Sequence, residues 1–166
     1  FVAERLSLPR KPDLSSWRQM VAKIDQPKPA LRIGVGGKYV ALRDAYISVR
    51  EALKHAALVL GLDLDLTWIH STDVEKEYGT RLLKDTHGIV VPGGFGGRGI
   101  EGKILAAQFD RLEKIPYFGL CLGMQLMVVD FARAVLHDTR ANSSEFDPAS
   151  PHPVIDLMPN QHQVKE

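Results

Sequence analysis

From residue 31 onward, the hydrophobic residues of the chain alternate between strand-like and helix-like spacing. Short apolar or alternating runs predict strands at 31–37, 62–69, 87–91, 115–120 and 154–158. Longer stretches with apolar residues three and four positions apart predict helices at 42–61, 71–85, 100–114 and 122–136. Thr72 and Glu75 have the spacing of a capping box at the start of the second of these helices. This alternation is typical of an α/β fold, so we predict a doubly wound, mostly parallel sheet flanked by helices.

The first 29 residues differ from the rest, because they are basic and interrupted by prolines. They hold one amphipathic segment, "DLSSWRQMVAKI" (13–24), which is followed by the helix-stopping "DQPKPA". This helix either belongs to a linker that packs on something outside the sequence or covers its own domain. We expect an interdomain linker at 1–29 and a single domain at 30–166.

Composition and charge exclude several classes of protein. Lys plus Arg is 21 and Asp plus Glu is 20, and the resulting net charge of +1 gives no basic field for a nucleic acid partner. Since no apolar run reaches the ~18 residues of a membrane span, no membrane partner is expected either. The single cysteine excludes an internal disulfide framework and fits the reducing cytoplasm. No metal site is predicted.

A glycine-rich stretch, "VVPGGFGGRGIEGK" (90–103), follows a predicted strand and contains two nucleotide-binding patterns. Residues 94–99 spell the dinucleotide pattern G-x-G-x-x-G, but the next strand lacks the acidic residue that would hold a ribose. Residues 97–103 spell a Walker A motif up to its last position, where Ile104 replaces the Ser or Thr that binds magnesium. These departures weaken both nucleotide patterns without excluding a nucleotide, and two other interpretations stand beside it. The glycines serve only a tight turn, or their backbone N–H groups bind an oxyanion.

The single cysteine, Cys121, stands in "GLCLG" (119–123), between a predicted strand and a predicted helix. G-x-C-x-G at a strand–helix turn has the form of a nucleophile elbow with cysteine in place of serine. The N–H groups that begin the helix favour the thiolate over the thiol, and the next residue offers its N–H to an oxyanion. The alternative is a small buried hydrophobic residue at a strand end. The short motif leaves both open.

Three stretches together resemble a known family: "PGGFGGRGIEGK", "GLCLGMQ" and "ANSSEFDP" are similar to the class I (triad) glutamine amidotransferase domain of the CTP synthases. The similarity runs from about Ile33 to Leu157. It implies a flavodoxin-like fold and the hydrolysis of L-glutamine to glutamate and ammonia. It also implies that the ammonia passes to a synthetase domain of the same polypeptide, which aminates ATP-activated UTP to CTP. ATP, Mg²⁺ and UTP would bind that other domain, so no cofactor is expected here. The family further implies GTP as an allosteric activator and a homotetramer in the cytoplasm.

The resemblance assigns roles to seven residues of this sequence. Cys121 would be the nucleophile that forms a glutamyl thioester, and the N–H groups of Gly94 and Leu122 would form the oxyanion hole. Phe95 would wall the substrate pocket. The remaining three residues are Gln125 and Glu145, which would bind glutamine, and Arg98, which would contact GTP in a mobile lid. Taken alone, Gln125 could equally bond the backbone, and Glu145 could be a solvated loop carboxylate.

One part of the family's pattern is missing, because no His-x-Glu occurs in the sequence. The six histidines, at 55, 70, 87, 137, 152 and 162, are read as surface or packing residues. We therefore expect a truncated domain, incomplete at its C-terminus and inactive by itself. Three alternatives stay open. The chain could be another class I amidotransferase or a γ-glutamyl hydrolase, a GTP-responsive nucleotide-binding module, or a degenerate amidotransferase that serves only assembly.

Overall fold

Four parallel strands form the central sheet of the protein. The structure is a computed structural model that describes residues 1–8, 13–158 and 161. The strands are β1 (Ala30–Gly37), β2 (Asp63–His70), β3 (Gly88–Val91) and β4 (Tyr117–Gly119), in the spatial order β2-β1-β3-β4. Val35 of β1 is in register with Trp68 of β2 and Val90 of β3. The parallel pairing follows because a helical connection joins each strand to the next, which returns the chain to the same edge of the sheet.

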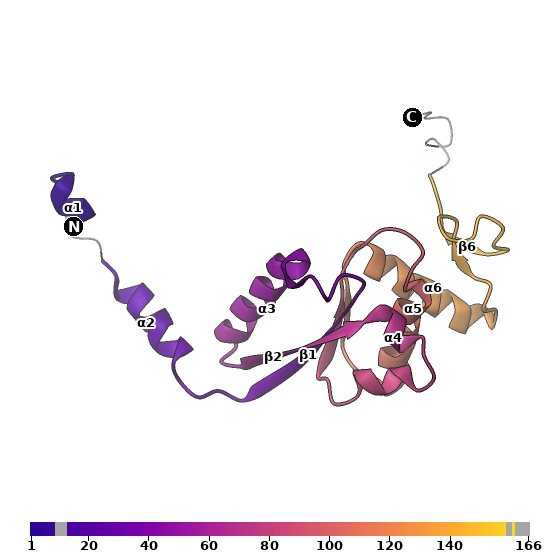
Figure 1. The fold of residues 1–166 in the computed structure, drawn as a ribbon, viewed down its shortest axis with the longest axis horizontal. Helices are drawn as coiled ribbons and strands as arrows, with labels where there is room; N and C mark the ends of the chain where they lie inside the picture. Colours follow the sequence, from indigo (N-terminus) through magenta and orange to yellow (C-terminus); the bar gives the residue numbers. More distant parts are fainter. Residues whose placement is uncertain (9–12, 159–160, 162–166) are drawn as a thin grey trace.

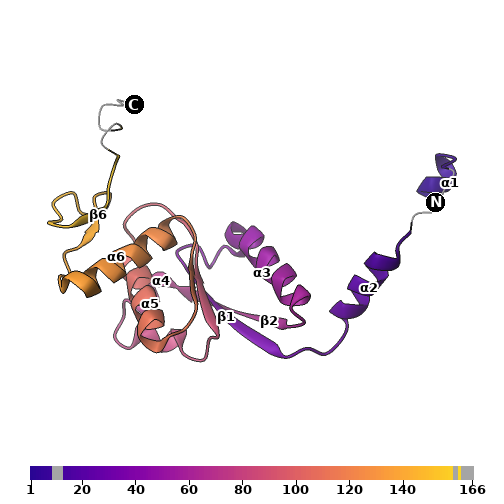
Figure 2. The same ribbon diagram turned by 180° about the vertical axis from the view of Figure 1, so that it is seen from behind.

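Helices cover both faces of this sheet, which confirms the predicted fold class (Figures 1 and 2). The short 3-10 turn η1 (Arg43–Tyr46) leads into α3 (Ile47–Val59), which lies on one face. The other face carries α4 (Ser71–Val74), the 3-10 helix η2 (Gly79–Leu83), α5 (Ile100–Glu113) and α6 (Leu122–Leu136). The bounds of α5 and α6 agree with the sequence prediction to within one residue.

Two clusters of buried side chains hold these layers together. The first joins the sheet to α4, η2 and α5 and consists of Ile69, Val74, Leu83, Ile89, Val91 and Ala106. The second joins α5 to α6 and consists of Ile100, Ile104, Leu122, Leu126 and Val129. Because Leu122 and Ile100 begin their helices, the second cluster fixes the two helix N-termini relative to each other.

The helix predicted at 71–85 is wrong, since the structure has only the single turn α4 followed by η2. Tyr78 adopts a left-handed conformation with φ 60°, which ends the helical path. Gly79 packs so tightly against the backbone of Val74 that a β-carbon would overlap it. The predicted capping box is also absent, because Thr72 bonds the ring of His70, and Glu75 accepts the N–H of Gly102 on α5.

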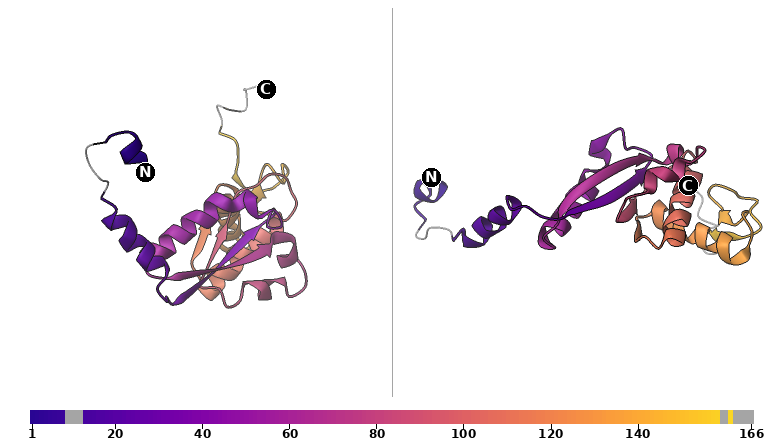
Figure 3. Two further views of the ribbon diagram at one scale, coloured as in Figure 1. Left: turned by 60° about the vertical axis from the view of Figure 1, so that its left-hand side comes forward. Right: turned by 90° about the horizontal axis from the view of Figure 1, so that it is seen from below.

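The N-terminal helices α1 (Val2–Arg5) and α2 (Ser15–Ile24) extend away from the sheet (Figure 3). Neither helix contains a buried residue, and Trp17 on the apolar face of α2 is 62% exposed. No residue of α2 is buried against the domain, and both interpretations of this helix stay open. In the described part of the chain, no helix combines the length and the apolar character needed to cross a membrane.

Candidate active site

The site begins where two neighbouring strands end. Val91, the last residue of β3, is in register with Gly119, the last residue of β4. The glycine-rich stretch leaves the sheet after the first of these residues, and "GLCLG" leaves it after the second. Parallel pairing therefore brings the two motifs to the same edge, as expected for a ligand site in a doubly wound sheet.

Cys121 lies on a sharp turn between β4 and α6. Its φ of 52° and ψ of −113° are close to the first central position of a type II′ turn, which normally requires glycine. The N–H of Gly123 donates to the carbonyl of Leu120 at 3.0 Å and closes this turn. The N–H of Leu120 in turn donates to the carbonyl of Val91 at 2.9 Å, which ties the turn to β3. The thiol is exposed, so it is not the buried hydrophobic residue of the alternative interpretation.

The glycine-rich turn after β3 passes directly beside the cysteine. A β-carbon on Gly93 would lie 3.3 Å from Cβ of Cys121 and 3.7 Å from its Sγ, so a larger residue here would crowd the cysteine. Gly94 follows immediately, and Leu122 is the first residue of α6. The structure therefore brings together Cys121, Gly94 and Leu122, the three residues predicted to form the nucleophile and the oxyanion hole.

Two lysines donate hydrogen bonds to backbone carbonyls of the glycine-rich turn. Nζ of Lys103, on α5, donates to the carbonyl of Pro92 at 3.1 Å. Nζ of Lys38, just after β1, donates to the carbonyl of Phe95 at 2.6 Å. Burial, and then the charge of Lys38, lower the pKa of Lys103 to about 8, while Cys121 acts in the opposite direction. Sequence reasoning missed both lysines. A signal was present for Lys103, because it occupies an apolar position of its helix, three residues after Ile100.

The other glycines of the stretch serve turns and helix packing. Gly99, with φ 77°, is the N-cap of α5, and Gly96 has φ 74° within the turn. A β-carbon on Gly99 or Gly102 would overlap Ser71 at the start of α4. Gly99 and Gly102 therefore let α4 and α5 approach each other, so turn geometry and helix packing explain part of each nucleotide-like pattern.

Gln125 and Phe95 lie on the two segments that meet at the cysteine, α6 and the glycine-rich turn. Gln125 lies one turn into α6, where its N–H donates to the carbonyl of Cys121 at 3.2 Å. Its side chain is half-buried. Phe95 is 83% exposed at the tip of the glycine-rich turn, so it is free to form one wall of a pocket but does not enclose one in this structure.

Arg98 and Glu145 lie together in a neighbouring cavity of about 510 Å³. The start of α5 and the segment after β5 (Asn142–Ser143) line this cavity, which also includes Glu75 and Glu101. Cys121, Gln125 and Gly94 are not among its lining residues. The structure therefore groups the predicted site residues into two sets, one around the thiol and one at the N-terminus of α5.

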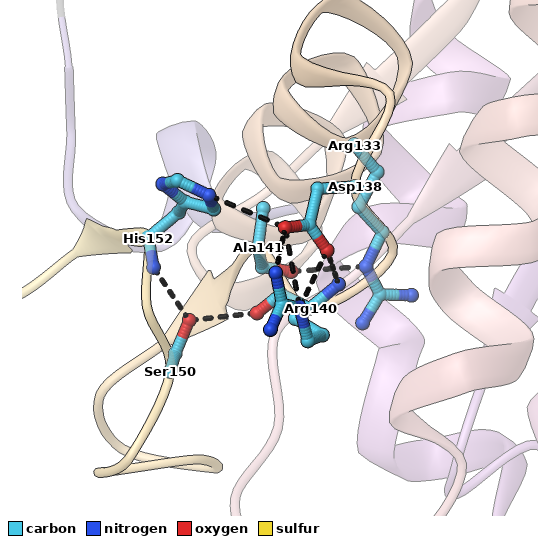
Figure 4. A network of polar contacts seen from close by, with 6 residues as sticks. All are labelled: Arg133, Asp138, Arg140, Ala141, Ser150 and His152. Atoms are coloured by element: carbon cyan, nitrogen blue, oxygen red, sulfur yellow. Dashed lines mark hydrogen bonds and ion pairs between the residues drawn. The ribbon is translucent and has the colours of Figure 1, made fainter.

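A polar network holds the segment that carries Glu145 (Figure 4). Arg140 bonds the carboxylate of Asp138 through its guanidinium, and this hydrogen bond is the main cause that holds the pKa of Asp138 well below its usual value. Nε2 of His152 lies 3.3 Å from the same carboxylate. Ser150 donates to the carbonyl of Arg140 at 2.7 Å, and Arg133 of α6 donates to that of Ala141 at 2.9 Å. The network closes the loop between α6 and β6 (Pro153–Ile155). Within this segment the two short strands β5 and β6 pair in parallel.

The described histidines have contacts elsewhere or lie away from the cysteine. The ring of His70 bonds the hydroxyl of Thr72, and the ring of His87 accepts the N–H of Arg32. The ring of His152 pairs with Asp138. His55 lines a cavity between α2 and α3, and His137 caps the end of α6. The sixth, His162, is outside the described residues. Within the described part of the chain, none of them is therefore placed as a base for Cys121.

Comparison with known proteins decides the family. The profile of the family "Glutamine amidotransferase class-I" matches residues 41–162, which include the elbow, the glycine-rich turn and Glu145. The chain belongs to the class I glutamine amidotransferases. Within this family, an exposed cysteine on a strained strand–helix turn is the arrangement expected of the nucleophile, in agreement with the sequence resemblance.

Individual relatives of this amidotransferase chain are CTP synthases. It is 54% identical to the CTP synthase of Roseiflexus sp. (strain RS-1) and 55% identical to that of Chloroflexus aggregans, over its whole length in both cases. The chain spans 30% of the length of each. A solved structure described as "Trypanosoma brucei CTPS - glutaminase domain with bound acivicin" is similar with a TM-score of 0.73 and 39% identity. It covers 79% of this chain, and the match covers 51% of the solved chain.

Proposed function

We propose that this chain carries the glutaminase site of a CTP synthase and that Cys121 hydrolyses the side-chain amide of L-glutamine. One observation carries the proposal above the others. The exposed thiol stands on a turn of φ 52°, directly against Gly93 and at the first N–H groups of α6. An exposed nucleophile beside a glycine-rich backbone turn and a helix N-terminus is the arrangement that acyl transfer requires, and it supports the proposal.

The chemistry follows from these positions. The thiolate attacks the amide carbon of glutamine, and the amide oxygen takes up the negative charge, which the N–H groups of Gly94 and Leu122 stabilise. The C–N bond then breaks, ammonia leaves with a proton from a general acid, and water cleaves the glutamyl thioester to glutamate and free thiol. In this scheme the general acid comes from outside the described residues.

The remaining predicted residues complete the substrate site in this proposal. Glu145 pairs with the α-ammonium group of glutamine, while Gln125 and Phe95 contact its body. Arg98 belongs to a lid that responds to GTP. Support for the roles of Gln125 and Phe95 is their position next to the cysteine in the chain's fold, on the first turn of α6 and on the glycine-rich turn. Arg98 and Glu145 share the separate cavity at the N-terminus of α5.

The wider part of the proposal concerns the whole protein. Ammonia passes to a synthetase domain of the same polypeptide, which aminates ATP-activated UTP to CTP in a cytoplasmic homotetramer. Residues 1–29 form the linker to that domain and residues 30–166 the amidotransferase domain. Identity of 54% over the full chain to a CTP synthase, and the unburied apolar face of α2, support this assignment.

The test is covalent labelling with acivicin, the compound named with the trypanosomal glutaminase domain. We expect one adduct, on the peptide that contains Cys121, and none in Cys121→Ser. L-glutamine should slow the labelling, whereas L-asparagine, which is one methylene shorter, should not. An adduct that persists in Cys121→Ser, or a rate that glutamine leaves unchanged, would rule out the proposed site.

Calorimetry separates the proposal from the nucleotide-binding alternative. The chain is titrated with L-glutamine, GTP and ATP in turn. Binding of either nucleotide together with no protection of Cys121 by glutamine would favour a regulatory module built on the glycine-rich turn.

A further inference from the structure

Lys103 is buried to an extent that is unusual for a lysine. Only 2% of the residue is exposed, although an isolated ammonium group is costly to remove from water. It lies on α5 one turn after Ile100, and its helix directs the side chain beneath the glycine-rich turn. There its Nζ bonds the carbonyl of Pro92 and would lie 3.5 Å from a β-carbon on Gly94.

We propose that Lys103 is a positioning residue of the site, whose ammonium group fixes the turn that presents Gly94 and supplies positive charge beneath Cys121. This inference rests on the proposed function only for the identity of the substrate. The position of the ammonium group against the turn that lies beside Cys121 follows from the geometry of the chain itself.

The surroundings of the ammonium group favour a role in charge stabilisation. The ionisable groups that interact electrostatically with the ammonium group are Lys38, which follows β1, and Cys121, which precedes α6. Glu75, at the end of α4, is engaged by the N–H of Gly102 at 3.0 Å. No carboxylate of the described residues pairs with Nζ of Lys103, whose only hydrogen bond there is to Pro92. The negative charge that Lys103 would stabilise is therefore the thiolate of Cys121 and, after attack on the substrate, the oxyanion.

A purely structural role is a poorer explanation. Burial and Lys38 both oppose the charged form, which is why the pKa of Lys103 falls to about 8. An ammonium group that is buried without a carboxylate partner carries a desolvation cost that no opposite charge offsets. A methionine would therefore fill the same space without this cost, and only the charge and the hydrogen bond distinguish lysine from it.

Three variants separate the two parts of the role. Lys103→Arg keeps charge and donor, Lys103→Gln keeps a donor without charge, and Lys103→Met keeps neither. Lys54→Met is the control, because Lys54 is exposed and lies near the amino end of β2, at the opposite edge of the sheet. Thermal melting first shows which variants fold. If Lys103→Met does not fold, the comparison rests on Lys103→Gln and Lys103→Arg.

The first measurement is the pH dependence of alkylation of Cys121 by iodoacetamide, a neutral reagent that does not need glutamine recognition. We expect the midpoint in Met and Gln to rise by about one pH unit, with a rate at pH 7 that is roughly five to ten times lower. Arg and the control should match the original chain. An unchanged midpoint in both Met and Gln would overturn the charge role.

The second measurement is the rate of acivicin labelling divided by the iodoacetamide rate. This ratio should fall several-fold further in Met than in Gln, since only Met loses the hydrogen bond to Pro92. Equal ratios in Met, Gln and the original chain would overturn the positioning role. If acivicin does not label even the original chain while the iodoacetamide midpoint still shifts, the proposed function fails and the charge role of Lys103 stands.

Discussion

Gly123 lies so close to Val91 that a β-carbon on the glycine would overlap the carbonyl oxygen of the valine. The same carbonyl accepts the N–H of Leu120 at 2.9 Å. Leu120, just before Cys121, bonds the carbonyl oxygen of Val91, and Gly123, two residues after Cys121, packs against the same atom. Because the glycine-rich turn starts immediately after Val91, this atom fixes the distance between the nucleophile and the backbone that would stabilise the oxyanion.

Replacement of Gly123 should therefore disturb both the site and the fold. We expect Gly123→Ala to lower the free energy of unfolding by ~2 kcal/mol or more, and to slow acivicin labelling of Cys121 at least tenfold. The matched control is Gly97→Ala in the neighbouring turn, where a β-carbon meets nothing within 4 Å. That variant should stay within ~0.5 kcal/mol of the original chain in urea unfolding. Normal labelling in a folded Gly123→Ala chain would contradict this view of the elbow.

The backbone of Cys121 should store strain that glycine would release. A φ of 52° with ψ of −113° is unfavourable for any residue with a β-carbon. We expect Cys121→Gly to be more stable than Cys121→Ala by about 1 kcal/mol, since both lose the thiol and only alanine keeps the β-carbon. Urea unfolding of the two variants measures the difference. Equal stability would show that the turn relaxes and holds no strain.

Local pattern predicted the elements that determine their own structure. The bounds of α6 agree with the prediction because the apolar period and the flanking glycines are both local signals. The helix expected at 71–85 failed because tertiary packing decides there, since Gly79 must fit against Val74 and Glu75 bonds α5 rather than its own helix.

The site shows the same division between local and tertiary signals. The elbow around Cys121 was recognisable from five consecutive residues. Lys103 was read only as part of an incomplete Walker A motif, because its bond to Pro92 depends on how α5 packs beneath the turn. Spacing alone also could not show that Arg98 and Glu145 line a cavity separate from the thiol.

An ion pair between the partly exposed Arg111 and the buried Asp130 joins α5 to α6 and gives a third prediction. Arg111 donates from Nε and from its terminal nitrogen to the two oxygens of Asp130, at 2.8 and 3.1 Å, and the Asp130 side chain is 4% exposed. Arg111→Met leaves that carboxylate without its partner, and the partial exposure of Arg111 moderates the cost, so we expect a loss of about 1–2 kcal/mol in the free energy of unfolding. The double variant Arg111→Met/Asp130→Leu should recover most of it. A double variant no more stable than the single one in urea would show that the pair itself, rather than the stranded charge, carries the energy.

Asp110 gives the fourth prediction, because its carboxylate is buried without a partner. The residue is 1% exposed on α5, and neither carboxylate oxygen has a hydrogen-bond partner. Burial raises the pKa of Asp110 to about 7, compared with an ordinary value of 3.8. Between these two values the folded chain keeps a proton that the unfolded chain has lost. The stabilising effect of this proton is full below about pH 4 and is lost as the pH rises through about 7.

Asp110→Asn removes this titration while keeping the shape of the side chain. We expect the variant and the original chain to differ little near pH 4, and the variant to be more stable at pH 8 by a few kcal/mol, with an upper limit of ~4. Asp63→Asn is the control, since Asp63 is exposed at the start of β2. Urea unfolding from pH 4 to pH 8 measures the effect. The free energies of unfolding of Asp110→Asn and the original chain could instead run parallel over that range. Asp110 would then be solvated or paired in solution, and the description of its carboxylate as buried without a partner would be wrong.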